Sequence, residues 1–306
     1  MKKLIKIGTR GSKLAIAQSM WIKSQLESRY KDIEVELVKI KTKGDKILDS
    51  PLSHIGGKGL FVKEIENALL ENKVDLAVHS IKDVPVELPE GLEIYVYPKR
   101  ENPLDAFISY SFKQIEELPS GAKVGTSSLR RQVQIKRLRK DIVIVPIRGN
   151  VDTRLRKLEE GLDAIILAVA GLIRLGLSEK ITQILSEKVM IPAIGQGALG
   201  IEVRTEDYEI KKMLCFLNDK ATEICIKAER GFLKELGGSC QVPIGANAKI
   251  INNKIQIIGM VSDLDAKRFI IDTILGSVDE PEETGKMLAY RLLKKGAKEI
   301  LEEIYL

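Results

Sequence analysis

The stretch LGGSCQVPIG, residues 236–245, places Cys240 where a thiol is expected to be accessible. Two glycines and a serine precede the sulfur, and a proline follows three residues later, so the stretch predicts a turn. Cys215 and Cys225 stand among apolar residues, and we expect both in helix cores. Because the three cysteines form no CxxC pair and the chain has two histidines, we expect no metal site.

Basic residues gather in the middle of the chain. Between Lys123 and Lys157 eleven lysines and arginines stand against two acids. An excess of this size predicts an anionic partner. Nucleic acid is one candidate, but the region lacks the interleaved aromatic residues on which single strands stack. A small, multiply charged anion is the other candidate.

Four arginines of this region are candidates for binding that anion. Arg130 and Arg131 follow GTSS in the first turn of a predicted helix, where the helix dipole disfavours cations. Two cations there indicate an anion opposite them. Arg148 and Arg154 follow the next predicted strand and would reach the same place, and guanidinium groups suit carboxylate or phosphate.

Asp83 is the acid most suited to chemistry. It stands in HSIKDVP, directly after a predicted strand and next to Lys82, and loops of this kind gather at one edge of a parallel sheet. The TRGS loop, with Arg10 and Ser12, follows another strand in the same way. Asp83 is either a turn-forming aspartate or an anion that stabilises a cation or relays protons. For His79 we expect a hydrogen bond at the strand end.

The elements that must position these residues form an alternating pattern. Strands are predicted at 4–9, 33–40, 75–79 and 92–97, and helices at 12–28 and 60–71. In the first helix Leu14, Ala17 and Trp21 recur at helical spacing. Alternation of strands and helices predicts a mostly parallel sheet.

The pattern then repeats. IGTRGSKLA (7–15) and VGTSSLRRQ (124–132) both lead from a strand through Gly-Thr and serine into a helix, so we expect two similar α/β lobes. The segment 101–107, ENPLDAF, is predicted to be a hinge. Two helices at 206–217 and 219–236, strands at 244–251, 255–263 and 267–275, and a helix at 281–303 predict a smaller α+β domain.

The composition is that of an ordinary globular protein. The 306 residues are 44% apolar and 30% charged, with a net charge of +6. The first residues lack the apolar block of a secretory signal, so a cytoplasmic location is expected. The glycine-rich segment 42–59 contains GGKG without the spacing of a phosphate-binding loop, and it is predicted to be a flexible lid.

Six motifs, in this order, resemble the hydroxymethylbilane synthase (porphobilinogen deaminase) family over nearly the whole chain: HSIKDVP, GGKGLF, GTSSLRRQ, RGNVDTRL, IGQGALGIE and GGSCQVPIGA. The resemblance implies a transferase of tetrapyrrole and haem biosynthesis. Such enzymes join four porphobilinogen molecules into linear 1-hydroxymethylbilane and release ammonia at each step. They use a dipyrromethane cofactor held by a thioether to a cysteine, which Cys240 matches here.

The resemblance also implies roles for individual residues. Asp83 matches the catalytic aspartate, which stabilises the cation that forms when ammonia leaves. The residues that match positions binding the acetate and propionate groups are Arg10, Ser12, Ser128, Arg130, Arg131, Arg148, Arg154, Arg174 and Gln196. Lys58 and Lys82 would neutralise further charge. His54 stands where well-known bacterial members carry lysine, so a lid contact there would depend on pH.

The family's fold has two doubly wound lobes like those of type II periplasmic solute-binding proteins, and a small α+β domain. We therefore expect a first lobe of residues 1–100 plus 194–216, a second of 101–193, and a cofactor-carrying domain of 217–306. The expected partners are porphobilinogen and the growing oligopyrrole, with no nucleic acid, no membrane and a monomeric state. The alternative is a two-lobed anion-binding protein without catalysis, and binding of nucleic acid through residues 123–157 is a third possibility.

Overall fold

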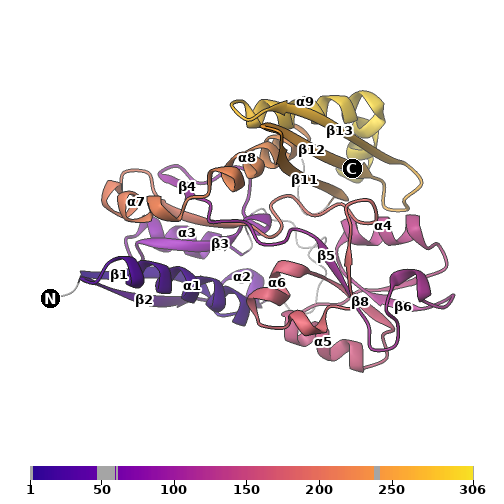
Figure 1. The fold of residues 1–306 in the computed structure, drawn as a ribbon, viewed down its shortest axis with the longest axis horizontal. Helices are drawn as coiled ribbons and strands as arrows, with labels where there is room; N and C mark the ends of the chain where they lie inside the picture. Colours follow the sequence, from indigo (N-terminus) through magenta and orange to yellow (C-terminus); the bar gives the residue numbers. More distant parts are fainter. Residues whose placement is uncertain (1–2, 47–58, 60, 238–241, 306) are drawn as a thin grey trace. The chain divides into compact units, whose positions relative to one another are not determined.

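The computed structural model describes residues 3–46, 59, 61–237 and 242–305, and three β-sheets organise them (Figure 1). The first sheet has the strand order β2-β1-β3-β10-β4. Strands β1, β2, β3 and β4 run in one direction, and β10 runs against them. Its strands are β1 (Lys3–Arg10), β2 (Ile33–Ile40), β3 (Leu76–Ser80), β4 (Leu92–Val96) and β10 (Leu199–Arg204).

The second sheet repeats this arrangement with the order β7-β6-β8-β5-β9. Here β5 is the strand that runs against the other four. Its strands are β5 (Asp105–Ile108), β6 (Lys123–Gly125), β7 (Val143–Val145), β8 (Ala164–Ala168) and β9 (Gln183–Leu185). Since β1 leads into α1 as β6 leads into α4, the predicted pair of similar, mostly parallel lobes is confirmed.

Helices and short turns connect the strands of both sheets. In the first they are α1 (Lys13–Arg29), α2 (Lys43–Lys46), α3 (Lys63–Leu70), the 3-10 turn η2 (Ile81–Asp83), α7 (Tyr208–Leu214) and the 3-10 turn η5 (Cys215–Leu217). In the second they are η3 (Ile115–Glu117), α4 (Leu129–Leu138), α5 (Val151–Glu159), α6 (Val169–Arg174) and η4 (Ser178–Lys180). Predicted strands and helices agree with these bounds to within a few residues.

The helix α1 is predicted correctly, but the face that it buries is not. Its buried residues include Ile22 and Leu26, which pack in the core of the first sheet, whereas Trp21 is 44% exposed. Apolar residues lie on more than one face of α1. The face that packs against the sheet is the one whose side chains fit the sheet surface.

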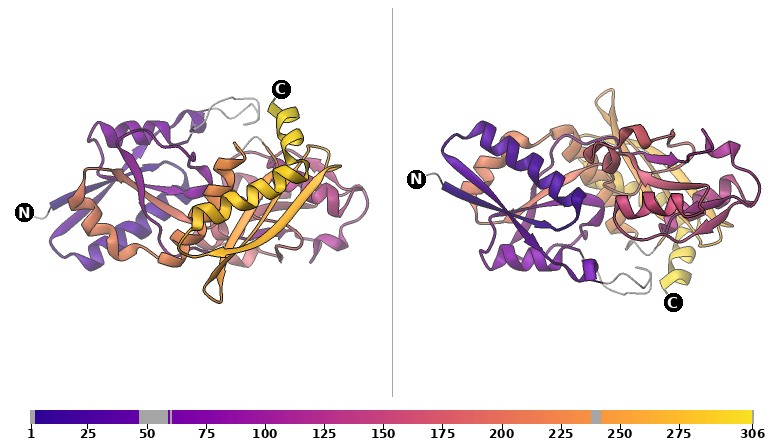
Figure 2. Two further views of the ribbon diagram at one scale, coloured as in Figure 1. Left: turned by 90° about the horizontal axis from the view of Figure 1, so that it is seen from above. Right: turned by 90° about the horizontal axis from the view of Figure 1, so that it is seen from below.

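The third sheet is antiparallel, with the order β11-β12-β13, and α9 lies across one of its faces (Figures 1 and 2). Its core includes Phe232, Ile257 and Leu288. The elements are α8 (Lys220–Glu235), β11 (Ile244–Ile251), β12 (Lys254–Ser262), β13 (Phe269–Ser277), α9 (Pro281–Leu292), the π-helical turn η6 (Leu293–Ala297) and α10 (Lys298–Tyr305). The predicted α+β character of this region is confirmed.

The helices α8 and α9 cross in close contact at two glycines. A Cβ atom on Gly285 would lie 1.9 Å from the carbonyl oxygen of Ala228, and one on Gly231 would lie 2.5 Å from that of Glu282. Both neighbours are backbone atoms and cannot turn aside, so the crossing requires glycine on each helix.

Three sequence predictions are wrong in detail. The predicted hinge is half strand, because Asp105 opens β5 and is fully buried. Cys215 is exposed in η5, where its Sγ lies 3.2 Å from Oη of Tyr95. The single helix predicted for 281–303 is interrupted at Gly296, whose φ of 101° is a left-handed conformation that favours glycine.

The described residues form two compact units. One contains residues 3–46, 59, 61–101 and 198–223, and the other contains 102–197, 224–237 and 242–305. The predicted division into three domains stays a prediction. None of the described helices has the length and apolar character needed to cross a membrane.

Candidate active site

A pocket opens in the first unit where β1 and β3 end. It is an open pocket, and its empty volume of about 420 Å³ includes space that is open to solvent. Apolar side chains such as Phe61 and Ile65 form part of its wall. Its polar side chains are Arg10, Ser12, Gln18, His79, Ser80 and Asp83. The structure therefore brings together the predicted residues Arg10, Ser12 and Asp83.

The position of Asp83 follows from the turn that carries it. Ile81 is buried and its backbone N–H donates to the carbonyl of Ala198 at 3.1 Å, which fixes the start of η2. The N–H of Val84 then donates to the carbonyl of Ile81 at 3.1 Å and closes the turn. Asp83 is exposed at the pocket and forms no ion pair with any residue in the described ranges. Its carboxylate can therefore interact with a ligand.

Arg10 and Ser12 begin the opposite side of the pocket. The guanidinium of Arg10 lies over the ring of Phe61, 4.2 Å from its centroid. The hydroxyl of Ser12 accepts a hydrogen bond from the N–H of Ala15 at 3.2 Å and caps α1. Lys82 is half-buried beside Asp83. Lys58 and His54 lie outside the described residues.

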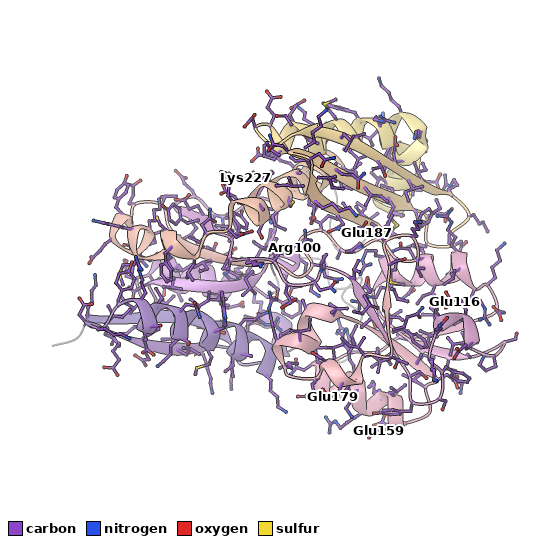
Figure 3. The ribbon with its side chains drawn as sticks, viewed as in Figure 1. Arg100, Glu116, Glu159, Glu179, Glu187 and Lys227 are labelled. Carbon is purple, nitrogen blue, oxygen red and sulfur yellow. The ribbon has the colours of Figure 1, made fainter. Side chains whose placement is uncertain are left out.

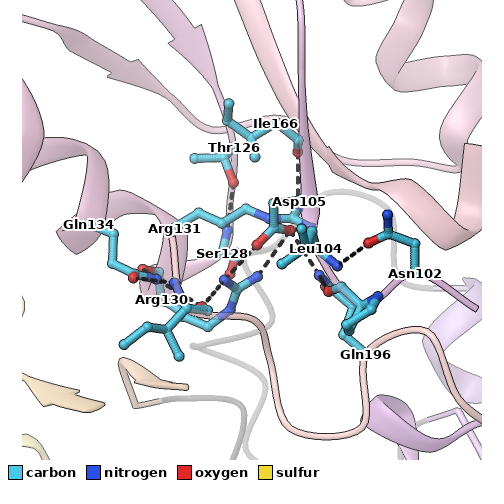
Figure 4. Close-up of polar contacts among 12 residues, drawn as sticks. Asn102, Leu104, Asp105, Thr126, Ser128, Arg130, Arg131, Gln134, Ile166 and Gln196 are labelled. Carbon is cyan, nitrogen blue, oxygen red and sulfur yellow. Dashed lines mark hydrogen bonds and ion pairs between the residues drawn. The ribbon is translucent and has the colours of Figure 1, made fainter. Parts of the chain in front are cut away.

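In the second unit Asp105 faces the two arginines of α4 (Figure 4). Arg130 donates to Oδ2 at 2.7 Å and to Oδ1 at 3.2 Å, and Arg131 donates to Oδ1 at 2.7 and 2.9 Å. All three side chains are buried. Burial alone would raise the pKa of Asp105, but the charges and hydrogen bonds of Arg130 and Arg131 hold it well below its ordinary value.

The cations of α4 therefore have an anion opposite them, and that anion belongs to the chain itself. Other acids of this unit, such as Glu116, Glu159 and Glu179, lie exposed (Figure 3). Asp105 needs its two partners because a buried, unpaired carboxylate is very costly. Arg130 Nε is buried with no hydrogen-bond partner among the described residues. This N–H of Arg130 can therefore donate to a ligand.

Gln196 completes this cluster. Its amide donates to the carbonyl of Pro103 at 2.7 Å and to Oδ1 of Asp105 at 3.1 Å. Ser128 is the N-cap residue of α4, and its side chain makes no capping hydrogen bond. The sequence prediction missed Asp105, although an acid directly before the apolar run AFI, inside a predicted hinge, is an unusual feature of the sequence.

Three further arginines from the sequence prediction lie in the second unit. Arg148 is half-buried in the loop before α5. Arg154, in α5, donates from Nε to the carbonyl of Gly149 at 2.9 Å, and Arg174, at the end of α6, donates to the carbonyl of Gly197 at 2.7 Å. These contacts tie the arginines to loops that follow strands, the edge at which α/β sheets bind ligands. Cys240 lies outside the described residues.

No group of three or more His, Cys, Asp and Glu side chains in the described ranges could hold a metal ion. The two described cysteines, Cys215 and Cys225, are in no disulfide. Cys225 is buried as predicted.

Comparison with known protein families gives two matches along the chain. Residues 5–212 match the family model described as porphobilinogen deaminase, dipyromethane cofactor binding domain. Residues 223–294 match the model of the porphobilinogen deaminase C-terminal domain.

Curated proteins give the same result. The chain is 53% identical over 304 residues to the porphobilinogen deaminase of Trichlorobacter lovleyi, covering 99% of this chain and 97% of that protein. It is 52% identical over 304 residues to that of Geobacter metallireducens, covering 99% and 95%.

Among solved structures, a periplasmic substrate-binding protein of an ABC transporter from Coxiella burnetii matches with a TM-score of 0.45 and 14% identity. That match covers 72% of this chain and 94% of the other.

Two family models that together span most of the chain, and relatives with about half of their residues identical, lead to one conclusion. The chain belongs to the porphobilinogen deaminase family.

Proposed function

We propose that this chain joins four porphobilinogen molecules into the linear tetrapyrrole 1-hydroxymethylbilane and releases one ammonia at each step. The observation that carries the proposal is the identity of about 50% to porphobilinogen deaminases over nearly the full length of both chains. The pocket with Arg10, Ser12 and Asp83 supports it, because each substrate molecule carries carboxylates and forms a cation when ammonia leaves.

Asp83 is proposed as the catalytic residue. Loss of ammonia leaves positive charge that spreads onto the pyrrole nitrogen, and a carboxylate beside that N–H stabilises the cation. The same carboxylate can take up the proton that is lost when the new carbon–carbon bond forms. Its exposure in the pocket and its freedom from ion pairs in the described parts of the chain support both roles.

The basic residues are proposed to bind acetate and propionate groups. A guanidinium can donate two parallel hydrogen bonds to one carboxylate, and hydrogen bonds to charged groups each contribute about 1.5–3 kcal/mol. In the first unit this role falls to Arg10, Ser12 and Lys82, and Lys58, which lies outside the described residues, is proposed to share it. In the second it falls to Ser128, Arg130, Arg131, Arg148, Arg154, Arg174 and Gln196.

The donors of the second unit fit a dipyrromethane cofactor, which is an oligopyrrole with carboxylate side chains. Arg130 Nε is a buried donor without a hydrogen-bond partner in the described ranges, and the hydroxyl of Ser128 is not used as a cap. When bound, the cofactor supplies the free pyrrole carbon to which the first substrate is joined. Cys240 is proposed to hold it through a thioether. Asp105 orients Arg130 and Arg131 toward such a group.

Intact mass of the untreated protein tests the proposal. An enzyme of this kind should be heavier than its 306-residue sequence by two linked pyrroles, and it should consume porphobilinogen. A chain whose mass equals its sequence after incubation with porphobilinogen, and which binds that molecule without turnover, would instead be the anion-binding alternative.

A cytoplasmic location and a monomeric state are also proposed. Neither described cysteine is in a disulfide, which agrees with a reducing compartment. Light scattering on the purified chain should give one chain of 34.1 kDa, and a mass of two chains would overturn the monomer.

A further inference from the structure

Three ionisable side chains are buried together in the first unit, behind the wall of the pocket. They are His79 on β3, Glu202 on β10 and Glu66 on α3, with exposed fractions of 5%, 1% and 6%. The pairing of the two strands sets Gly200 opposite His79 and Glu202 opposite Ala77. The helix α3 packs on both strands (Figure 1). We refer to these three residues as the buried trio.

The trio contains one base and two acids. His79 Nε2 and Glu202 Oε2 are 2.9 Å apart, so the imidazole and this carboxylate pair with each other. The other oxygen of Glu202, Oε1, is buried without a hydrogen-bond partner among the described residues. A buried carboxylate oxygen without a donor is costly, so a second negative charge on a neighbouring buried carboxylate is disfavoured.

The surroundings of Glu66 favour that proton. Burial, and then the negative charge of Glu202, raise the pKa of Glu66 to about 7, while His79 and Lys63 act in the opposite direction and Glu64 adds to the increase. Arg204, the next charged residue on β10, is already paired with Asp207. Near neutral pH Glu66 therefore gains or loses one proton.

The trio is connected to the pocket through the chain. His79 lines the pocket, and Ser80, the next residue, exchanges hydrogen bonds with Gln18. The turn η2, which carries Asp83, follows directly. The charge of the trio thus lies behind the surface at which a cation is proposed to form. Charges interact more strongly in the protein interior than in water, because the dielectric constant there is lower.

We propose that Glu66, His79 and Glu202 set the charge behind the Asp83 pocket, so that release of the proton of Glu66 to water adds one negative charge and favours formation of the substrate cation. Glu66 and Glu202 do not line the pocket. They are positioning residues that act through His79 and the pocket wall. This inference rests on the proposed function for its effect on turnover, but the proton of Glu66 does not depend on it.

The variant Glu66→Gln tests this inference, because glutamine keeps the size of a protonated glutamate and cannot ionise. Wild-type kcat for porphobilinogen should rise as the pH increases through about 7. The variant should match wild type at low pH and fall below it at high pH, on the order of tenfold, with KM unchanged. Glu66→Asp, which keeps a titrating carboxyl group, should restore part of the rise.

Glu71→Gln is the matched control, since Glu71 directly follows the same helix and is exposed. It should keep the wild-type pH profile. If Glu66→Gln lowers kcat by the same factor at every pH, or follows the wild-type profile, the inference is wrong.

Infrared difference spectroscopy separates this inference from the proposed function. Wild type should show the carbonyl band of a protonated, buried carboxyl group that disappears as the pH rises through about 7, and Glu66→Gln should lack the band. Absence of the band in wild type would show that Glu66 is not protonated and would overturn the inference. A normal band in a chain that does not consume porphobilinogen would instead overturn the proposed function.

Discussion

Arg131 holds Asp105 through two hydrogen bonds to the same oxygen, from Nη2 at 2.7 Å and from Nε at 2.9 Å, and the arginine side chain is only 6% exposed. If the guanidinium of Arg131 turned toward another anion, the buried negative charge of Asp105 would lose these two hydrogen bonds. The cluster therefore acts as a rigid, pre-oriented unit, and this rigidity reduces the ordering cost of binding.

Asp105→Asn should destabilise the protein, because it removes the negative charge that both buried guanidinium groups contact and leaves them only neutral acceptors, such as the carbonyls of Ile191 and Ile166. Breaking a buried ion pair costs about 3–5 kcal/mol, which urea denaturation would detect as a lower midpoint. Asp141→Asn is the control, since Asp141 pairs with Arg139 at the surface, and its effect should be much smaller. Equal midpoints for the two variants would contradict the structural role of Asp105.

Glu66→Gln should change how stability depends on pH. Because the pKa of Glu66 is raised from 4.5 to about 7, the folded state holds a proton that the unfolded state releases. The free energy of unfolding of wild type should therefore fall as the pH rises from 4.5 to 7, and the variant should lack this part of the decrease. Melting temperatures across this range measure the difference, and a variant that loses stability in parallel with wild type would refute it.

Asp83→Asn should leave the fold intact and remove most of the turnover. Asp83 is exposed and forms no ion pair within the described residues, so little stability is lost. Without its charge the rate should fall by about 10²–10³, the loss typical of a group that stabilises developing charge. Steady-state kinetics and thermal unfolding measure the two properties, and a variant with wild-type kcat would remove Asp83 from the mechanism.

Cys240→Ser should yield a protein whose mass equals that of its sequence and which does not form hydroxymethylbilane. Cys215→Ser provides a matched control, because Cys215 is the exposed thiol in the part of the chain that the structure describes. The control should keep both the added mass and the turnover. If the two variants exchanged these results, the cofactor would be attached to Cys215.

Gly285→Ala should destabilise the third sheet and its helices. The new Cβ would lie 1.9 Å from the carbonyl oxygen of Ala228, so α9 must move away from α8. Overpacking of this kind costs about 1–3 kcal/mol or more. In Gly11→Ala, by comparison, the Cβ meets no atom within 4 Å, and thermal unfolding should show no comparable loss.

Local sequence predicted the elements of the fold well, because strand and helix periodicities reflect which residues are buried. It also predicted that Arg10, Ser12 and Asp83 lie together, since parallel strands end at one edge of their sheet. Asp105 could not be found this way. Its partners Arg130 and Gln196 lie 25 and 91 residues away in the sequence, and only the folded chain brings them to the start of β5.

The first sheet takes one of its inner strands from far along the chain. Residues 199–204 form β10, which lies between β3 and β4, whereas β5 of the second sheet precedes β6, β7 and β8. During synthesis, two-thirds of the chain must therefore leave the ribosome before the first unit can close, and until then β3 and β4 present open edges that can pair with other chains. The second sheet can assemble earlier, so nascent chains are expected to fold from the middle outward.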